Sequence, residues 1–90
     1  MDVNDYIYEV YKEKSFSVAA KKFFVSQPAL SAMIKKVEKS LGVMLFDRST
    51  SPITLTEAGK IYIKNIEEIR SLQKDYTKNL TTCANLKQAL

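Results

Sequence analysis

The stretch that decides the fold of this chain is residues 16–42, which read FSVAAKKFFVSQPALSAMIKKVEKSLG. Two short helices joined by a tight turn are predicted here, over residues 17–24 and 27–41. Ser17 and Ser26 are the expected N-caps, since a serine side chain satisfies free backbone N–H groups at a helix start. The sequence therefore predicts a helix-turn-helix unit.

The second of these helices has two distinct faces. An apolar stripe at spacings of four, three and four predicts packing against the rest of the domain: Leu30, Ile34, Val37 and Leu41. The opposite face carries Gln27, Ser31 and Lys35, and Pro28 occupies the first turn, where its missing N–H costs nothing. Gln, Ser and Lys side chains can bond to base edges in a major groove, and helix N-termini favour phosphate. The alternative is a helical bundle whose polar face only meets water.

A small two-stranded wing is predicted after the second helix. Gly42 is the predicted stop of the second helix. The segment VMLFDRSTSPITLTEAG follows it, with an apolar run, a polar tip over residues 47–52, and then alternation of apolar and polar residues. This pattern predicts strands near residues 44–47 and 53–55.

Residues 15–59 resemble the N-terminal winged helix-turn-helix of the LysR-type transcriptional regulators. The motifs that carry the resemblance are AA at Ala19 and Ala20, VSQPALS at 25–31, LG at Leu41 and Gly42, LFxR at 45–48, and LTxAG at 55–59. Together they imply a mainly α fold, with a three-helix bundle and short β-hairpin wing followed by a long linker and dimerisation helix.

The resemblance also implies a function and a domain organisation. We expect a bacterial, cytoplasmic regulator that binds double-stranded promoter DNA as a homodimer through its linker helix, or as a dimer of dimers in the full-length protein. Residues 1–59 are the expected DNA-binding domain, and residues 60–90 the linker helix and hinge. Family members sense a small-molecule effector through a larger C-terminal domain, which these 90 residues do not supply.

The positive charge is concentrated on the helix-turn-helix. Residues 15–50 hold six basic and two acidic side chains, which predicts an electrostatic footprint for phosphates. The predicted DNA-contacting residues are Ser17, Lys21, Lys22, Ser26, Gln27, Pro28, Ser31, Lys35, Lys36, Arg48, Thr50 and Ser51. Arg48 is the arginine of the LFxR motif. It could contact a phosphate or, equally, have a structural role in holding the wing against the helices. The sequence has Ala32 and Met33 after Ser31, and Ser51 and Thr54 in the wing, where basic residues are common in the family.

An N-terminal helix over residues 3–14 is predicted to hold the motif in place. Its apolar residues recur at helical spacing, and we expect them to pack on Phe23, Leu30, Ile34 and Phe46. Aromatic side chains at positions 6, 8 and 11 could instead form a base-stacking platform, but such a platform needs a basic groove and this helix is acidic.

Beyond Gly59 the hydrophobic period is that of a coiled coil, in a helix predicted over residues 57–82. The predicted dimerisation seam is Tyr62, Ile66, Ile69, Gln73, Tyr76 and Leu80. Polar Gln73 in its middle would set the register. The alternative is that this helix packs only on its own domain, especially through Ile61 and Tyr62.

The composition excludes several other classes of protein. The chain has one cysteine and no histidine, so we expect no internal disulfide, no zinc site and no cofactor. A histidine-free chain without a nucleophile beside a base or a glycine-rich phosphate loop is not expected to be an enzyme. No apolar run is long enough to cross a membrane. The remaining alternative is a protein-interaction module that uses the long C-terminal helix and does not bind DNA.

Overall fold

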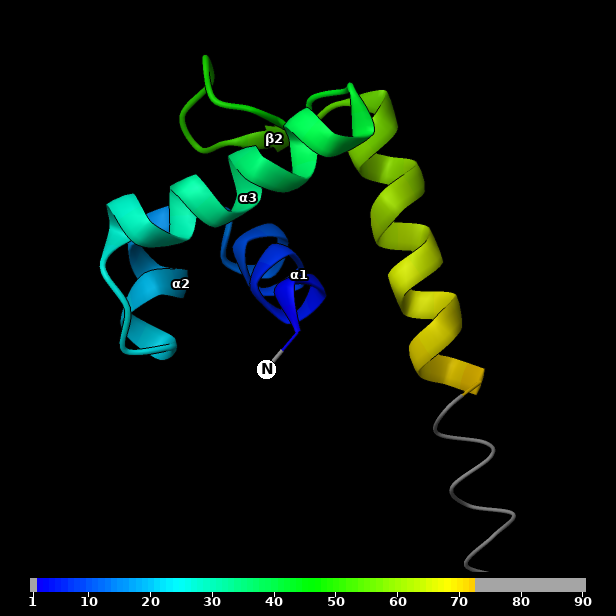
Figure 1. Cartoon of the computed structure of the whole chain (residues 1–90), viewed down its shortest axis with the longest axis horizontal. Helices are drawn as coiled ribbons and strands as arrows, with labels where there is room; N and C mark the ends of the chain where they lie inside the picture. Colours follow the sequence, from blue (N-terminus) through cyan, green and yellow to red (C-terminus); the bar gives the residue numbers. More distant parts are fainter. Residues whose placement is uncertain (1, 73–90) are drawn as a thin grey trace, which may run out of the picture.

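The computed structural model of the chain describes residues 2–72 and is mainly helical, with one short hairpin (Figure 1). Its elements in chain order are α1 (Val3–Glu13), α2 (Phe16–Lys22), α3 (Gln27–Leu41), β1 (Phe46–Asp47), β2 (Thr54–Leu55) and a helix over residues 57–72, called here the long helix. The predicted fold class is confirmed. The predicted end of the long helix near residue 82 lies outside the described residues.

The three N-terminal helices contact one another around a single core. Ile7 and Val10 of α1 are buried there, as the helical spacing predicted. The largest fully buried side chains of the core are Ile7, Val10, Leu30, Ile34, Leu45 and Phe46. The predicted contact between α1 and Phe23 is made by Tyr6, whose ring centroid lies 4.5 Å from that of Phe23. The first helix therefore acts as the scaffold of the helix-turn-helix.

The wing is an antiparallel hairpin in which Phe46 pairs with Leu55 and Asp47 with Thr54. Both strands are shorter than predicted. The backbone N–H groups of Leu45 and Phe46 donate to the buried carboxylate of Glu38, so they do not contribute to a longer ladder. The hairpin is confirmed, but a side chain from α3 limits its length.

The long helix starts against the wing and continues along α1 (Figure 1). A Cβ atom on Gly59 would lie 2.0 Å from the carbonyl oxygen of Leu45, so only glycine permits this close approach. Ile63 and Ile66 of this helix are buried in the core of the same chain. These contacts fix the first part of the long helix to its own domain.

Candidate nucleic-acid interface

The N-terminal half of α3 presents its polar face outward. The Ser26 hydroxyl accepts a hydrogen bond from the backbone N–H of Ala29 at 3.2 Å, so the predicted cap is confirmed. Leu30 and Ile34 are fully buried on the inner side of the helix. The outer face therefore carries Gln27, Pro28 and Lys35, all exposed, and Ser31, which is partly buried.

The apolar stripe of α3 does not continue to its C-terminus as predicted. Leu41 is about half exposed, and Glu38 instead turns inward, with only 3% of its surface accessible. Glu38 lies one turn after Ile34, so it continues the buried row, whereas Leu41 turns toward solvent. Gly42 ends the helix as expected, in the left-handed conformation with φ 76°.

The cap of α2 was predicted at the wrong serine. Ser15 is the N-cap, and its hydroxyl accepts from the backbone N–H of Val18 at 3.2 Å. Because Phe16 is buried in the core, the helix begins at that residue, which leaves Ser17 exposed in the first turn. Ser17 is therefore not the N-cap of α2, and its side chain is exposed to solvent.

Lys22 is engaged within the protein, which argues against its predicted phosphate contact. Its ammonium nitrogen lies 2.6 Å from a carboxylate oxygen of Glu13 and 2.8 Å from one of Glu9. Hydrogen bonds to these two carboxylates raise the pKa of Lys22, and the bond from Lys22 lowers the pKa of Glu9. Two acidic groups therefore neutralise this charge and tie α2 to α1.

The Arg48 side chain is partly buried and joins the wing to α3. One of its terminal nitrogens is 3.1 Å from the Glu38 carboxylate, and its guanidinium lies 4.9 Å from the centre of the Phe16 ring. Between its two possible roles, this placement favours the structural one.

Sequence reasoning did not identify Glu38 as the partner of Arg48. The signal was present, because an acidic residue one turn after a buried isoleucine must find donors if it turns inward. Glu38 finds three, the backbone N–H groups of Leu45 and Phe46 and the guanidinium.

The tip of the wing is organised by Asp47. Its carboxylate accepts from the backbone N–H of Ser49 at 2.9 Å and from the Ser49 hydroxyl, and these bonds lower the pKa of Asp47. The Thr50 hydroxyl lies 3.3 Å from the Asp47 carbonyl oxygen and 3.2 Å from the Thr54 hydroxyl. Thr50 and Ser51 are both exposed, next to one another at the tip.

Three of the predicted phosphate-binding lysines are exposed on α2 and α3: Lys21, Lys35 and Lys36. Within residues 2–72, none of the three takes part in an ion pair. Their charges are therefore available to an external anion, in contrast to that of Lys22.

The predicted dimerisation residues are only partly placed. Ile66 is 4% exposed within its own chain, and the Tyr62 hydroxyl donates to the side chain of Asn4 on α1. Both therefore belong to the domain itself, while Ile69 is exposed. Gln73, Tyr76 and Leu80 lie outside the described residues.

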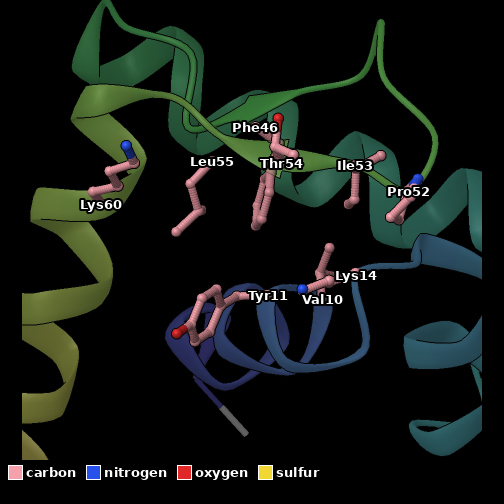
Figure 2. A pocket seen from close by; sticks show the side chains of 9 residues that line it. All are labelled: Val10, Tyr11, Lys14, Phe46, Pro52, Ile53, Thr54, Leu55 and Lys60. Atoms are coloured by element: carbon pink, nitrogen blue, oxygen red, sulfur yellow. The ribbon is translucent and has the colours of Figure 1, made fainter.

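A groove of about 490 Å³ lies between α1, the wing and the start of the long helix (Figure 2). Val10, Phe46 and Leu55 contribute to its apolar lining, and Lys14 and Lys60 to its polar lining.

Over residues 2–72 no group of three acidic, histidine or cysteine side chains is placed to hold a metal ion. No helix in that part of the chain is long and apolar enough to span a membrane.

The chain matches known regulatory proteins in sequence and in fold. Residues 4–60 match the family described as bacterial regulatory helix-turn-helix protein, lysR family. The chain is 42% identical over 71 residues to the probable RuBisCO transcriptional regulator of Thalassiosira pseudonana, covering 79% of this chain and 23% of that protein. It is 44% identical over 69 residues to the uncharacterized HTH-type regulator YbhD of Escherichia coli, covering 77% and 21%.

Solved structures give the same result. The DNA-binding domain of BenM in complex with catB site 1 DNA aligns with a TM-score of 0.76 at 29% identity, covering 87% of this chain and 86% of that one. The CbnR DNA-binding domain in complex with DNA aligns with a TM-score of 0.75 at 29% identity, covering 93% and 99%. The chain spans about a quarter of the length of the curated relatives it matches. The chain belongs to the lysR family of bacterial regulatory helix-turn-helix proteins, which are transcriptional regulators and not enzymes.

Proposed function

We propose that this chain binds duplex promoter DNA in a sequence-specific manner, with the outer face of α3 in the major groove. The observation that carries the proposal is that Leu30 and Ile34 fix one side of α3 in the core, while Gln27 and Lys35 project from the other. The solved complexes of the BenM and CbnR domains with DNA support this use of the fold.

Each exposed group has a role that fits its chemistry. The Gln27 amide can pair with adenine through two hydrogen bonds, and the Ser31 hydroxyl can donate to or accept from a base edge. The N-terminus of α3 favours a phosphate through the helix dipole and the backbone N–H of Gln27, since Pro28 has no N–H and the Ala29 N–H donates to Ser26. Thr50 and Ser51 at the wing tip can donate to the DNA backbone, which positions the protein without reading sequence.

Selection of bound sequences from random duplex DNA tests the class and returns the binding site. On the selected site, Gln27→Ala is expected to lose about 1–3 kcal/mol and to flatten discrimination at one base pair. Lys36→Gln serves as the matched control, because loss of a phosphate contact weakens all sequences alike. Equal losses on selected and random DNA for Gln27→Ala would remove it from base readout.

The long helix offers a surface for a second copy of the chain. Its outward side carries apolar residues with a polar one between them, at steps of four, four and three: Ile61, Asn65, Ile69 and Leu72. Over the described part of the helix we propose this row as the pairing surface, because Ile66 of the predicted seam is covered by the domain; Ile69 belongs to both rows. Pairing of two such helices supports a homodimer, for which an interrupted palindrome is the matching site.

The proposed domain organisation follows from this arrangement. Residues 1–59 bind DNA, and the linker helix in residues 60–90 pairs the two copies. The relatives are between three and four times as long as this chain. Response to a small-molecule effector, which the resemblance implies, is proposed for a further domain of the whole protein.

A further inference from the structure

The long helix contacts α1 a second time, far from its start. A terminal nitrogen of Arg70 lies 2.6 Å from a carboxylate oxygen of Asp5, and the guanidinium lies 4.4 Å from the centre of the Tyr8 ring. Arg70 is eleven residues beyond Gly59, which corresponds to about 16 Å along a helix. The helix therefore contacts the wing near its start and, about three turns later, the N-terminal half of α1.

The second contact orients the helix more than it stabilises the fold. The side chains of Asp5 and Arg70 are each about 40% exposed, and exposed ion pairs contribute little to stability. The apolar contacts of Ile63 and Ile66 are non-directional, so they restrict tilting of the helix on the core less than a contact of fixed geometry does. A planar guanidinium that stacks on a ring and pairs with a carboxylate restricts that motion.

Two further contacts join the long helix to α1. The Tyr8 hydroxyl is 3.4 Å from the Glu67 carboxylate, and the Tyr62 hydroxyl donates to Asn4. All of these bonds connect the long helix with α1 and none involves α3. Changing Arg70 should therefore alter the direction of the helix while leaving the surface of α3 intact.

We infer that the contact of Arg70 with Asp5 and Tyr8 sets the spacing between the two DNA half-sites that the dimer prefers. This inference rests on the proposed function, because it needs two domains joined through their long helices. A tilt of about 10° displaces the helix by about 3 Å at the distance of Arg70. One base pair rises by about 3.4 Å and turns the groove by about a tenth of a turn. Arg70 is thus a positioning residue that touches no DNA.

The test compares DNA duplexes that carry one half-site with duplexes that carry two half-sites at a series of spacings. The unchanged chain is expected to favour one spacing, and Arg70→Ala to reduce the preference over neighbouring spacings by about threefold or more. Affinity for the single half-site should stay within about twofold, since α3 is untouched. Arg70→Lys should fall between the two, because it keeps the charge and loses the planar group.

Glu57→Gln is the matched control. It breaks the exposed ion pair between Glu57 and Lys60, which joins two residues of the same helix. Its spacing profile should equal that of the unchanged chain. An Arg70→Ala profile that also equals it, or an unchanged chain without any preferred spacing, would overturn the inference and leave DNA binding in place. Failure of the unchanged chain to bind any duplex would contradict the proposed function as well.

A second measurement reports the tilt without DNA. Spin labels at Lys21 and Glu68, both exposed, would be placed in a chain whose Cys83 is replaced by serine and diluted with unlabelled chain. The distance distribution between the labels should broaden in Arg70→Ala relative to Glu57→Gln. An unchanged distribution would show that Ile63 and Ile66 alone fix the helix, and the inference would be wrong.

Discussion

The carboxylate of Glu38 in α3 lies 3.1 Å from the guanidinium of Arg48 in the wing. The Glu38 side chain is buried and that of Arg48 is partly buried. The same carboxylate accepts the backbone N–H of Leu45 at 2.6 Å. One buried side chain therefore links α3 to the start of the hairpin. Because a buried charge needs all of its partners, the angle between α3 and the wing depends on this pair.

Replacing Arg48 by methionine should destabilise the domain by about 3 kcal/mol, because it leaves a buried carboxylate without its counter-charge. Methionine keeps apolar contact with Phe16, so the loss reports mainly on the charge. The free energy of unfolding from urea denaturation measures the effect. The paired change Arg48→Met with Glu38→Leu should recover part of the loss. If Arg48→Met instead keeps full stability and weakens binding to all DNA sequences, Arg48 contacts phosphate.

Much of the fold could be predicted because local patterns and packing agree. The row of Leu30 and Ile34, the cap at Ser26 and the stop at Gly42 each follow from the sequence, and the structure places all of them as expected. The structure also explains the glycine at position 59, because the long helix approaches the Leu45 carbonyl there too closely for a Cβ atom.

The remaining features depend on contacts that local patterns do not contain. Ser15 and Ser17 are equally good caps, and burial of Phe16 decides between them. On the long helix, the row through Ile66 has coiled-coil spacing, and a second apolar row runs through Ile61 at steps of four, four and three. Only the docking of the helix on α1 determines which row is covered. Likewise, Lys22 lies in a basic stretch, but the acids that neutralise it belong to α1.

Lys22, which is paired with two carboxylates, and Lys36, which is exposed, should affect the salt dependence of DNA binding differently. Lys36→Gln should reduce the slope of log affinity against log salt by about 1, because one phosphate contact is lost. Lys22→Gln should leave the slope nearly unchanged, since Glu9 and Glu13 already pair with this ammonium group. Fluorescence anisotropy on one duplex at several salt concentrations measures both. A drop in slope for Lys22→Gln equal to that of Lys36→Gln would show that Lys22 leaves its partners for DNA.

The two faces of the long helix should respond oppositely to the same substitution. Ile61→Asp adds a charge to a side chain that is 64% exposed, so the domain should stay folded while the chain becomes monomeric. Ile66→Asp places an unpaired charge in the core and should unfold the domain. Light scattering and circular dichroism on both variants separate the effects. A folded monomer from Ile66→Asp, together with a dimer from Ile61→Asp, would restore the seam through Tyr62, Ile66 and Ile69.

Phe24, in the turn between α2 and α3, should be replaceable with a gain in stability. Its φ angle is 56°, a left-handed conformation that costs a non-glycine residue roughly 1–2 kcal/mol, and its side chain is 96% exposed. Asparagine tolerates this conformation better, and no buried contact is lost on removing the ring. Phe24→Asn is therefore expected to raise the free energy of unfolding by about 0.5–1 kcal/mol. For a domain of this size that corresponds to a rise in Tm of roughly 2–8 °C, which thermal denaturation at fixed chain concentration can resolve.

Phe23→Asn is the control for this last substitution, because the neighbouring ring packs on Tyr6 and its removal should lower stability. Binding to the selected duplex should be the same for Phe24→Asn as for the unchanged chain, since the change lies outside the polar face of α3. A loss of stability in Phe24→Asn would mean that the exposed ring stabilises the chain through a contact with a second copy. Such a loss should then depend on chain concentration, and repeating the denaturation over a range of concentrations would detect it.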